Sequence, residues 1–302
     1  MRRRLSQAIL LAAAFALALQ SGFAQQSDSA EIPESQNACS APPSSDEDVF
    51  GPTIAIAEVQ FDGDLRLPVA DQQQIASSLR QLSYPLGLDR ATDELVERVR
   101  EAWQDHGYVQ VEVSGENRIL SSSPVSESIA VTVRVNAGEQ YRLGEIAFKN
   151  NKAITGVKKL RDLFPISDGE ISDRSKIAKG LENLRKEYGE LGYINFTVIP
   201  TPRFNEDNQT VSFDMDIDEG KQFVVSSISF LGLDQRVSDD LSKELLLKPG
   251  DVFDKQLIDL FFKEHSSSLP PETSSDSEVG FHIDARAGTV AIAFDFRPCA
   301  AE

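Results

Sequence analysis

The stretch that decides the fold reads VNAGEQYRLGEIAF (residues 135–148) and recurs as IDEGKQFVVSSISF (residues 217–230). Both copies place a glycine, a glutamine, an aromatic residue, an isoleucine and a phenylalanine at the same positions, and they lie roughly 80 residues apart. Each copy has the pattern of a strand that ends, a glycine turn and a second strand that begins. The repeat therefore predicts a boundary where one small folding unit closes and the next one opens.

A third strand of the same kind ends at Phe61, ahead of the strands that end at Phe148 and Phe230. These three strands divide the folded part of the chain into three comparable units. We call them unit one (residues 52–137), unit two (138–219) and unit three (220–299). We expect the angle between neighbouring units to depend on the repeated stretch that joins them.

Within each unit the hydrophobic spacing predicts a strand, two helices and two further strands. The second helix is the most regular, and in unit one it places Leu95, Val99 and Trp103 on one face. Gly107-Tyr108 follows this helix, Gly192-Tyr193 follows its counterpart, and unit three has no such pair. We expect the glycine to end the helix in a left-handed conformation and the tyrosine to fill the core. The expected helices are 69–82, 89–106, 155–164, 172–191, 238–247 and 254–265; the expected later strands are 108–113, 129–136, 194–200, 210–218, 279–286 and 289–296, with a polar connector at 114–128.

The order of these elements resembles a tandem of POTRA (polypeptide-transport-associated) domains, found in the periplasmic arm of outer-membrane β-barrel assembly factors. The resemblance rests on Phe61-Asp62-Gly63, on the two Gly-Tyr pairs, and on the repeat around Gly138 and Gly220 with Gly232. It implies an α+β fold of three β-α-α-β-β domains, each with a three-stranded mixed sheet and two helices on one face. The well-known relatives carry a C-terminal barrel, for which this sequence shows no equivalent.

The N-terminus has the layout of a secretory signal peptide. Three arginines at positions 2–4 precede an apolar run over residues 8–19, and small residues at 22–24 favour cleavage after Ala24. Residues 25–51 are rich in Ser, Pro and acidic residues, which predicts a disordered leader. Cys39 and Cys299 would both reach an oxidising compartment, where they either form a disulfide or remain two unpaired thiols.

The charge and the scarcity of reactive groups exclude several functions. A net charge of −18 argues against nucleic acid or an anionic membrane surface as the main partner. The three histidines have no metal-ligand spacing, and neither Walker nor dinucleotide phosphate loops occur. Asp214, Asp216 and Asp218 alternate along one strand face, where they either hold a cation or simply face water. We expect no enzyme, no cofactor, no small-molecule substrate and no metal.

The resemblance implies that the third strand of each unit is central and the second strand lies at an edge. A free edge exposes unpaired N–H and C=O groups to which an extended peptide adds as another strand, a mode called β-augmentation. The strand 279–284 is such an edge in unit three. In units one and two the predicted peptide-binding residues are Tyr108, Val109, Gln110, Val111, Glu112, Val113, Ile194, Asn195, Phe196, Thr197, Val198 and Ile199.

Together these features predict an exported periplasmic scaffold in assembly or secretion of outer-membrane proteins. Its expected partners are an outer-membrane β-barrel protein or unfolded barrel precursors, and we expect it to contact the membrane only through such a partner. The alternative is a structural protein that organises the cell envelope, because POTRA-like domains also occur in cell-division proteins. Retention of residues 1–19 as a membrane anchor would favour that alternative.

Overall fold

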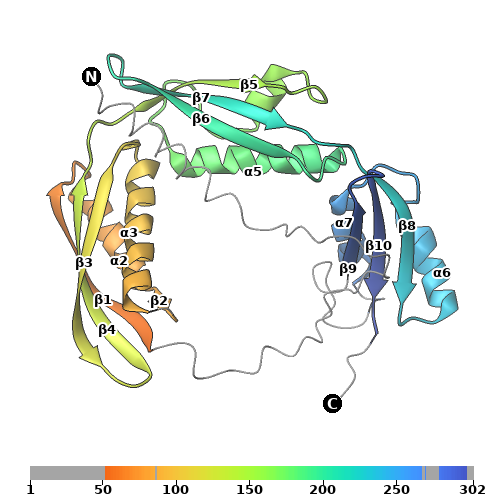
Figure 1. The fold of residues 1–302 in the computed structure, drawn as a ribbon, viewed down its shortest axis with the longest axis horizontal. Coiled ribbons are helices and arrows are strands. Elements are labelled where there is room, and N and C mark those ends of the chain that lie inside the picture. Colours follow the sequence, from red (N-terminus) through yellow and green to blue (C-terminus); the bar gives the residue numbers. More distant parts are fainter. Residues whose placement is uncertain (1–51, 86, 267–268, 270–278, 298–302) are drawn as a thin grey trace.

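The computed structural model describes residues 52–85, 87–266, 269 and 279–297. They form three separate sheets, each flanked by helices, and the three units follow one another along an arc (Figure 1). Each sheet encloses a hydrophobic cluster with its own helices. The fold is therefore α+β with three mixed sheets, as the sequence predicts, whereas the residue bounds of the units stay predictions. Within the described residues no helix is both long and apolar enough to cross a membrane.

Unit one has a four-stranded sheet in the order β2-β1-β4-β3. Its elements are β1 (Thr53–Asp64), α2 (Val69–Leu79), β2 (Ser83–Tyr84), α3 (Leu88–Asp105), β3 (Glu112–Ser122) and β4 (Ser126–Asn136). Alternate residues of β4 point inward, so that Ile129, Val131 and Val133 are almost completely buried against Leu95 and Trp103 of α3. The Trp103 indole also donates a hydrogen bond to the Leu65 carbonyl oxygen (2.8 Å).

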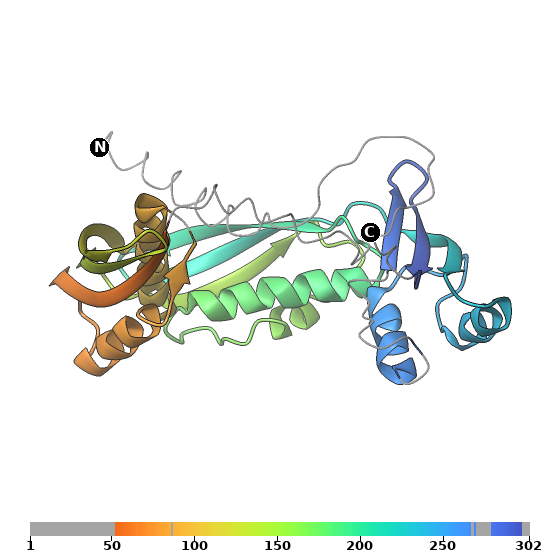
Figure 2. The same cartoon turned by 90° about the horizontal axis from the view of Figure 1, so that it is seen from below.

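Unit two has a three-stranded sheet in the order β5-β7-β6, and its helices pack beneath that sheet (Figure 2). The elements are β5 (Arg142–Lys149), α4 (Val157–Asp162), α5 (Arg174–Glu190), β6 (Thr197–Asn205) and β7 (Thr210–Asp218). Asp173 is the N-cap of α5, and its carboxylate accepts the Lys176 amide (3.1 Å). Leu181, Leu184 and Tyr188 of this helix are buried, so its apolar stripe holds it to the sheet.

Unit three repeats this arrangement with the strand order β8-β10-β9. The elements are β8 (Val224–Leu231), α6 (Gln235–Glu244), α7 (Lys255–His265), β9 (Val279–Asp284) and β10 (Thr289–Asp295). Its core is aromatic: Phe230 stacks on Phe294 with ring centroids 4.6 Å apart, and Phe261 packs edge-on against the same ring. The interlocking rings take the place that aliphatic residues hold in unit one.

The three sheets share one topology. The first strand of each unit pairs in parallel with the last strand, and the last strand pairs in antiparallel with the second. Consequently β4, β7 and β10 are central, and β3, β6 and β9 lie at an edge. Unit one departs from the predicted three strands through β2, but single bridges Arg142↔Ile171 and Val224↔Val252 stand at the same place in the other units. In every unit the opening strand therefore pairs with the segment between the two helices. This pairing covers two residues in unit one and one residue in each of the other units.

A residue at the end of the opening strand, or directly after it, has a positive φ in all three units. The angle is 105° at Gly63, 65° at Asn150 and 80° at Gly232. Asparagine tolerates the left-handed region better than most residues, which explains why it replaces glycine in unit two. In units one and three a side chain would also strike the backbone: a Cβ on Gly63 would lie 2.4 Å from the Val135 carbonyl oxygen.

Three sequence predictions about strands are wrong. The strand predicted at 108–113 begins only at Glu112, and the strand predicted at 194–200 begins only at Thr197. The polar connector predicted at 114–128 instead forms most of a long hairpin, because β3 continues to Ser122 and β4 starts at Ser126. Polar residues fit this hairpin because one face of β3 and its outer end face water.

Candidate functional site

The two Gly-Tyr pairs lie where one unit meets the next. Gly107 ends α3 with a φ of 87°, and Gly192 ends α5 with a φ of 78°, as predicted. Tyr108 is buried in the core of unit one, and Tyr193 packs against the core of unit two. The sequence did not reveal a second role for the glycines. A Cβ on Gly107 would lie 2.7 Å from the Ile171 side chain, so the helix end and the next unit touch.

We call the contact between units one and two, around Gly107 and Tyr141, joint one, and the contact between units two and three, around Gly192 and Phe223, joint two. The backbone hydrogen bonds of the two joints correspond one to one. In joint one the Tyr141 amide donates to the Gly107 carbonyl oxygen (2.8 Å), and in joint two the Phe223 amide donates to that of Gly192 (2.9 Å). The repeated glutamine adds a further bond in each case: its side-chain amide donates to the last turn of the preceding helix, at His106 in joint one and at Leu191 in joint two (2.8 and 2.9 Å). The repeat thus encodes a joint.

The aromatic residue of each joint also binds the loop before the second helix. Ser172 donates its amide to the Tyr141 carbonyl oxygen (3.0 Å), and Phe253 does the same to Phe223 (2.9 Å). Each joint therefore connects a helix end, a strand start and a loop. Main-chain hydrogen bonds thus link neighbouring units at each joint.

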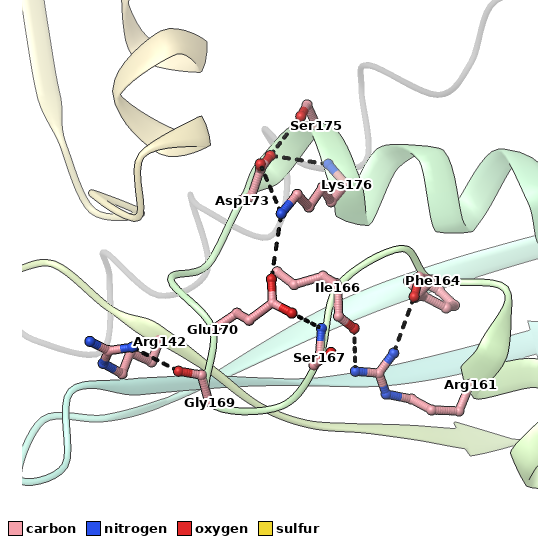
Figure 3. Close-up of polar contacts among 10 residues, drawn as sticks. All are labelled: Arg142, Arg161, Phe164, Ile166, Ser167, Gly169, Glu170, Asp173, Ser175 and Lys176. Atoms are coloured by element: carbon pink, nitrogen blue, oxygen red, sulfur yellow. Dashed lines mark hydrogen bonds and ion pairs between the residues drawn. The ribbon is translucent and has the colours of Figure 1, made fainter. Parts of the chain in front are cut away.

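The loop that reaches joint one is held in place by its own polar contacts (Figure 3). The Arg161 guanidinium donates to the carbonyl oxygens of Phe164 (3.5 Å) and Ile166 (2.6 Å). Glu170 accepts the Ser167 amide (3.1 Å) and pairs with Lys176 (3.5 Å). Since these bonds fix both ends of the loop, Ile171 and Ser172 are presented to the preceding unit in a defined position.

Joint one brings the C-terminus of α3 against the N-terminus of α5. The Asp105 carboxylate accepts the Ser175 amide (3.0 Å), and the Arg174 guanidinium donates to Glu101. Burial raises the pKa of Asp105 above its usual range, and repulsion from Asp173 raises this pKa further. The dipole at the C-terminus of α3 also disfavours the charge, whereas the Ser175 amide at the N-terminus of α5 and Arg174 favour it. The net rise in the pKa means that the charged form of Asp105 is disfavoured at this joint.

We expect Asp105→Asn to stabilise the protein at pH 7, with a rise in the unfolding temperature of about 1 to 3 °C. The asparagine oxygen still accepts the Ser175 amide while the charge is gone. A raised folded-state pKa means that wild-type stability falls as pH rises from the ordinary aspartate range through the raised pKa. The gain should therefore shrink below pH 4, which thermal melts followed by Trp103 fluorescence at several pH values would measure.

The matched control is Asp89→Asn, in the first turn of the same helix. There the negative charge favours the helix dipole, so this variant should melt slightly lower than wild type at pH 7. A rise in unfolding temperature for both variants would show that net charge, rather than the joint, controls the effect.

Four of the twelve predicted peptide-binding residues are buried and lie outside the strands. Tyr108, Val109 and Val111 are each at most 7% exposed, and the Val111 amide bonds back to Tyr108 (3.1 Å). Phe196 is 5% exposed and stacks on Tyr188 with ring centroids 4.3 Å apart. The remaining residues ahead of the strands are Gln110, Ile194 and Asn195, so that only Glu112, Val113, Thr197, Val198 and Ile199 lie in an edge strand.

The alternation of apolar residues after each Gly-Tyr pair suggested a half-buried strand, but it comes from a tight turn that packs at the joint. Val109 belongs to the core of unit two rather than unit one, and Ile194 packs against the core of unit three. An alternation of apolar residues shows that every second side chain is buried, but it does not show whether the side chains pack in their own unit or against a neighbouring unit. A role of residues 108–111 and 194–196 in peptide binding stays a prediction, and these residues do not belong to an edge strand.

Strand β3 offers the longest open edge. The Ser123 amide donates to the Ser126 carbonyl oxygen (2.9 Å), which closes the hairpin and sets its register. Counting back through the bulge between Ile119 and Ser121, we infer that odd-numbered residues from 113 to 119 turn their N–H and C=O groups outward. The Arg100 guanidinium donates to the Val113 carbonyl oxygen (3.5 Å), so this oxygen does not point toward β4, as the assignment requires. No proline interrupts β3.

Strand β6 has an edge of the same kind, but two prolines lie in it, Pro200 and Pro202. Pairing with β7 is continuous from Thr197 to Asn205, so the proline nitrogens must face away from β7. The outer edge therefore lacks two of its donors. Prolines at such positions are a common protection against unwanted strand addition. Strand β9 contains no proline and is shorter, at six residues.

The alternating aspartates of β7 are engaged by neighbouring side chains. Asp214 pairs with Lys149 (2.8 Å) and Arg203 (3.0 Å), and Asp216 accepts the Asn150 amide (2.7 Å). These bonds lower the pKa of Asp214, chiefly through the Lys149 contact. Among the residues that the structure describes, no group of three or more metal-ligating side chains is placed to hold an ion. The predicted signal peptide, the predicted leader, Cys39 and Cys299 lie outside the described residues.

Comparison with known proteins agrees with this architecture. Residues 141–220 match the POTRA family, described as a surface antigen variable number repeat. The chain is 24% identical over 237 residues to a Treponema pallidum (strain Nichols) protein described as an outer membrane protein assembly factor. That alignment covers 76% of this chain and 28% of the relative. The chain is also 25% identical over 134 residues to the outer membrane protein assembly factor BamA of Buchnera aphidicola subsp. Acyrthosiphon pisum (strain APS), covering 44% of this chain and 22% of that protein.

Among solved structures, POTRA domains 3–5 of Haemophilus influenzae BamA give a TM-score of 0.59 at 20% identity. That similarity covers 81% of this chain and 97% of the solved chain. The described part of this protein therefore has the fold of a tandem of POTRA domains. It is similar to the POTRA part of BamA and spans only about a quarter of the length of the curated relatives described above.

Proposed function

We propose that this protein is a periplasmic, non-enzymatic scaffold in outer-membrane protein assembly. It binds extended segments of unfolded barrel precursors by β-augmentation and docks to an outer-membrane partner. The observation that carries the proposal is the free, proline-free edge of β3 in a tandem of POTRA-like domains. The similarity to assembly factors supports the proposed pathway, and main-chain pairing supports a broad range of precursors.

Two features make β3 the preferred edge. It is eleven residues long, against nine for β6 and six for β9, so it offers more main-chain bonds. Apolar side chains are also exposed toward its outer end, with Ile119 at 47%, Leu120 at 38% and Val125 in the adjoining turn at 77%. An extended apolar peptide would gain both main-chain pairing and apolar burial at this position.

The proposal is tested by titrating isotope-labelled protein with synthetic peptides that correspond to strands of an outer-membrane barrel protein. We expect chemical-shift changes along β3 and tenfold or weaker binding in Ile119→Pro, which removes one outward donor and restricts the preceding residue. Ile119→Thr is the matched control, because it removes the same side chain and keeps the N–H; it should lose much less affinity. Equal binding by both variants, or shifts scattered over the surface, would contradict the proposal.

A reciprocal variant tests the inference about β6. Pro200→Val combined with Pro202→Thr restores both outward donors at residues whose φ a strand can accommodate. We expect the same peptides to produce new shifts along β6 and the variant to self-associate more readily than wild type. If the peptides cause no chemical-shift changes along β6 in this variant, the availability of N–H donors does not control which edge binds the peptide.

A further inference from the structure

Joint two contains a groove that no part of the proposed function uses. Its volume is about 790 Å³, and it lies where the ends of β6 and β7 meet the linker to unit three. Ile199 forms an apolar part of its wall and is 60% exposed, an unusual fraction for a large aliphatic residue in a strand. Tyr193 and Ala153 extend this apolar part.

Joint one has a hollow at the corresponding place, lined by the equivalent tyrosine and glutamine, Tyr108 and Gln140. This hollow is smaller, about 260 Å³, and Arg66 lies in its wall. The Arg66 guanidinium pairs with Asp64 and with Glu139 of the linker, both at 2.9 Å. The chain therefore places its own cation against the linker carboxylate of joint one.

Carboxylates also line the groove of joint two, but the balance of charge is different. Asp216, Asp218 and Glu219 face one lysine, Lys152. Glu219 is already engaged, because one of its oxygens accepts the amides of Lys152 and Ala153 (2.6 and 2.8 Å). Asp216 and Asp218 each bind a neighbouring amide through Oδ1, and a carboxylate can accept further bonds. The groove thus combines an apolar wall with an excess of negative charge.

We propose that the groove of joint two binds a basic residue flanked by apolar residues, supplied by an extended segment of a partner protein. The arginine or lysine pairs with Asp216 and Asp218 beside the linker. Its apolar neighbours cover Ile199 and Tyr193. An arginine fits best, since its planar guanidinium can pair with two carboxylates at once.

The probe is the capped peptide acetyl-Gly-Ile-Arg-Ile-Gly-amide, titrated into the isotope-labelled protein. We expect saturable shifts at residues 150–153, 197–199 and 216–222, with affinity that falls as salt is raised. Asp216→Asn with Asp218→Asn should weaken binding about fivefold or more, in line with the loss of two partly exposed ion pairs. Ile199→Ser should weaken it through the lost apolar contact.

Charge-matched and sequence-matched controls make the test specific. Asp239→Asn with Asp240→Asn removes two carboxylates from α6 and should leave binding unchanged. A peptide with Glu in place of Arg should not bind; if it binds equally well, the proposal fails. Saturable shifts on calcium chloride alone that abolish peptide binding would assign the groove to a metal ion instead. Ile119→Pro should bind this probe normally, which separates the proposal from that for β3.

Discussion

Replacing Gly192 with valine should uncouple unit three from unit two. A β-branched residue at a φ of 78° is a backbone outlier and costs about 1–3 kcal/mol by itself. The new Cβ would also lie 2.6 Å from the Val252 side chain and 2.9 Å from the Phe223 carbonyl oxygen. Because the Gly192 carbonyl accepts the Phe223 amide, relieving this overlap breaks a main-chain bond of the joint.

Residual dipolar couplings would measure this effect, since they report the orientation of each sheet in a common frame. We expect one shared alignment tensor for units two and three in the wild type and two different tensors in Gly192→Val. The control is Gly189→Ala, three residues earlier in α5, where a Cβ meets nothing within 4 Å. That variant should gain about 0.5–1 kcal/mol from helix propensity and keep the joint. An unchanged orientation in Gly192→Val would show that the joint does not depend on this glycine.

Replacing Gly63 with alanine should destabilise unit one by about 3 kcal/mol. A φ of 105° lies beyond the left-handed region that asparagine can use, so any side chain is strained there. The Cβ would also lie 2.4 Å from the Val135 carbonyl oxygen. Because this oxygen belongs to the backbone, no change of side-chain rotamer can relieve the overlap. Gly63 and Val135 are partners in the parallel pairing of β1 with β4, and that pairing would have to open.

The single tryptophan, Trp103, is fully buried in unit one and reports this unfolding selectively. We expect the denaturant midpoint followed by Trp103 fluorescence to fall in Gly63→Ala, while hydrogen exchange in β7 stays protected. Gly87→Ser is the control: its φ is −58°, a Cβ there meets nothing within 4 Å, and serine is a good N-cap for α3. Loss of protection in β7 together with unit one would mean that the units unfold as a single body.

Much of the fold could be predicted because the information is local and repeated. The strand that ends at Phe148 and the helix that carries Leu181 and Tyr188 each show a clear hydrophobic period. Because the order of elements recurs in three units, each element could be recognised by comparison with its counterparts. The first residues of the predicted binding edges, 108–111 and 194–196, in contrast, lie ahead of the strands. After Gly107 and Gly192 the apolar alternation reflects packing at a turn, and no local period distinguishes this from a strand.

The sequence by itself determined the three-unit α+β architecture, the Gly-Tyr helix ends and the absence of any recognisable catalytic motif. The tertiary structure alone decided that these glycines hold the joints, that β3 is open and β6 is guarded by Pro200 and Pro202, and that joint two keeps a groove where joint one has Arg66. The physical reason is one of distance along the chain. Helix and strand periods arise from neighbouring residues, whereas joints, edges and grooves depend on which distant segments come into contact.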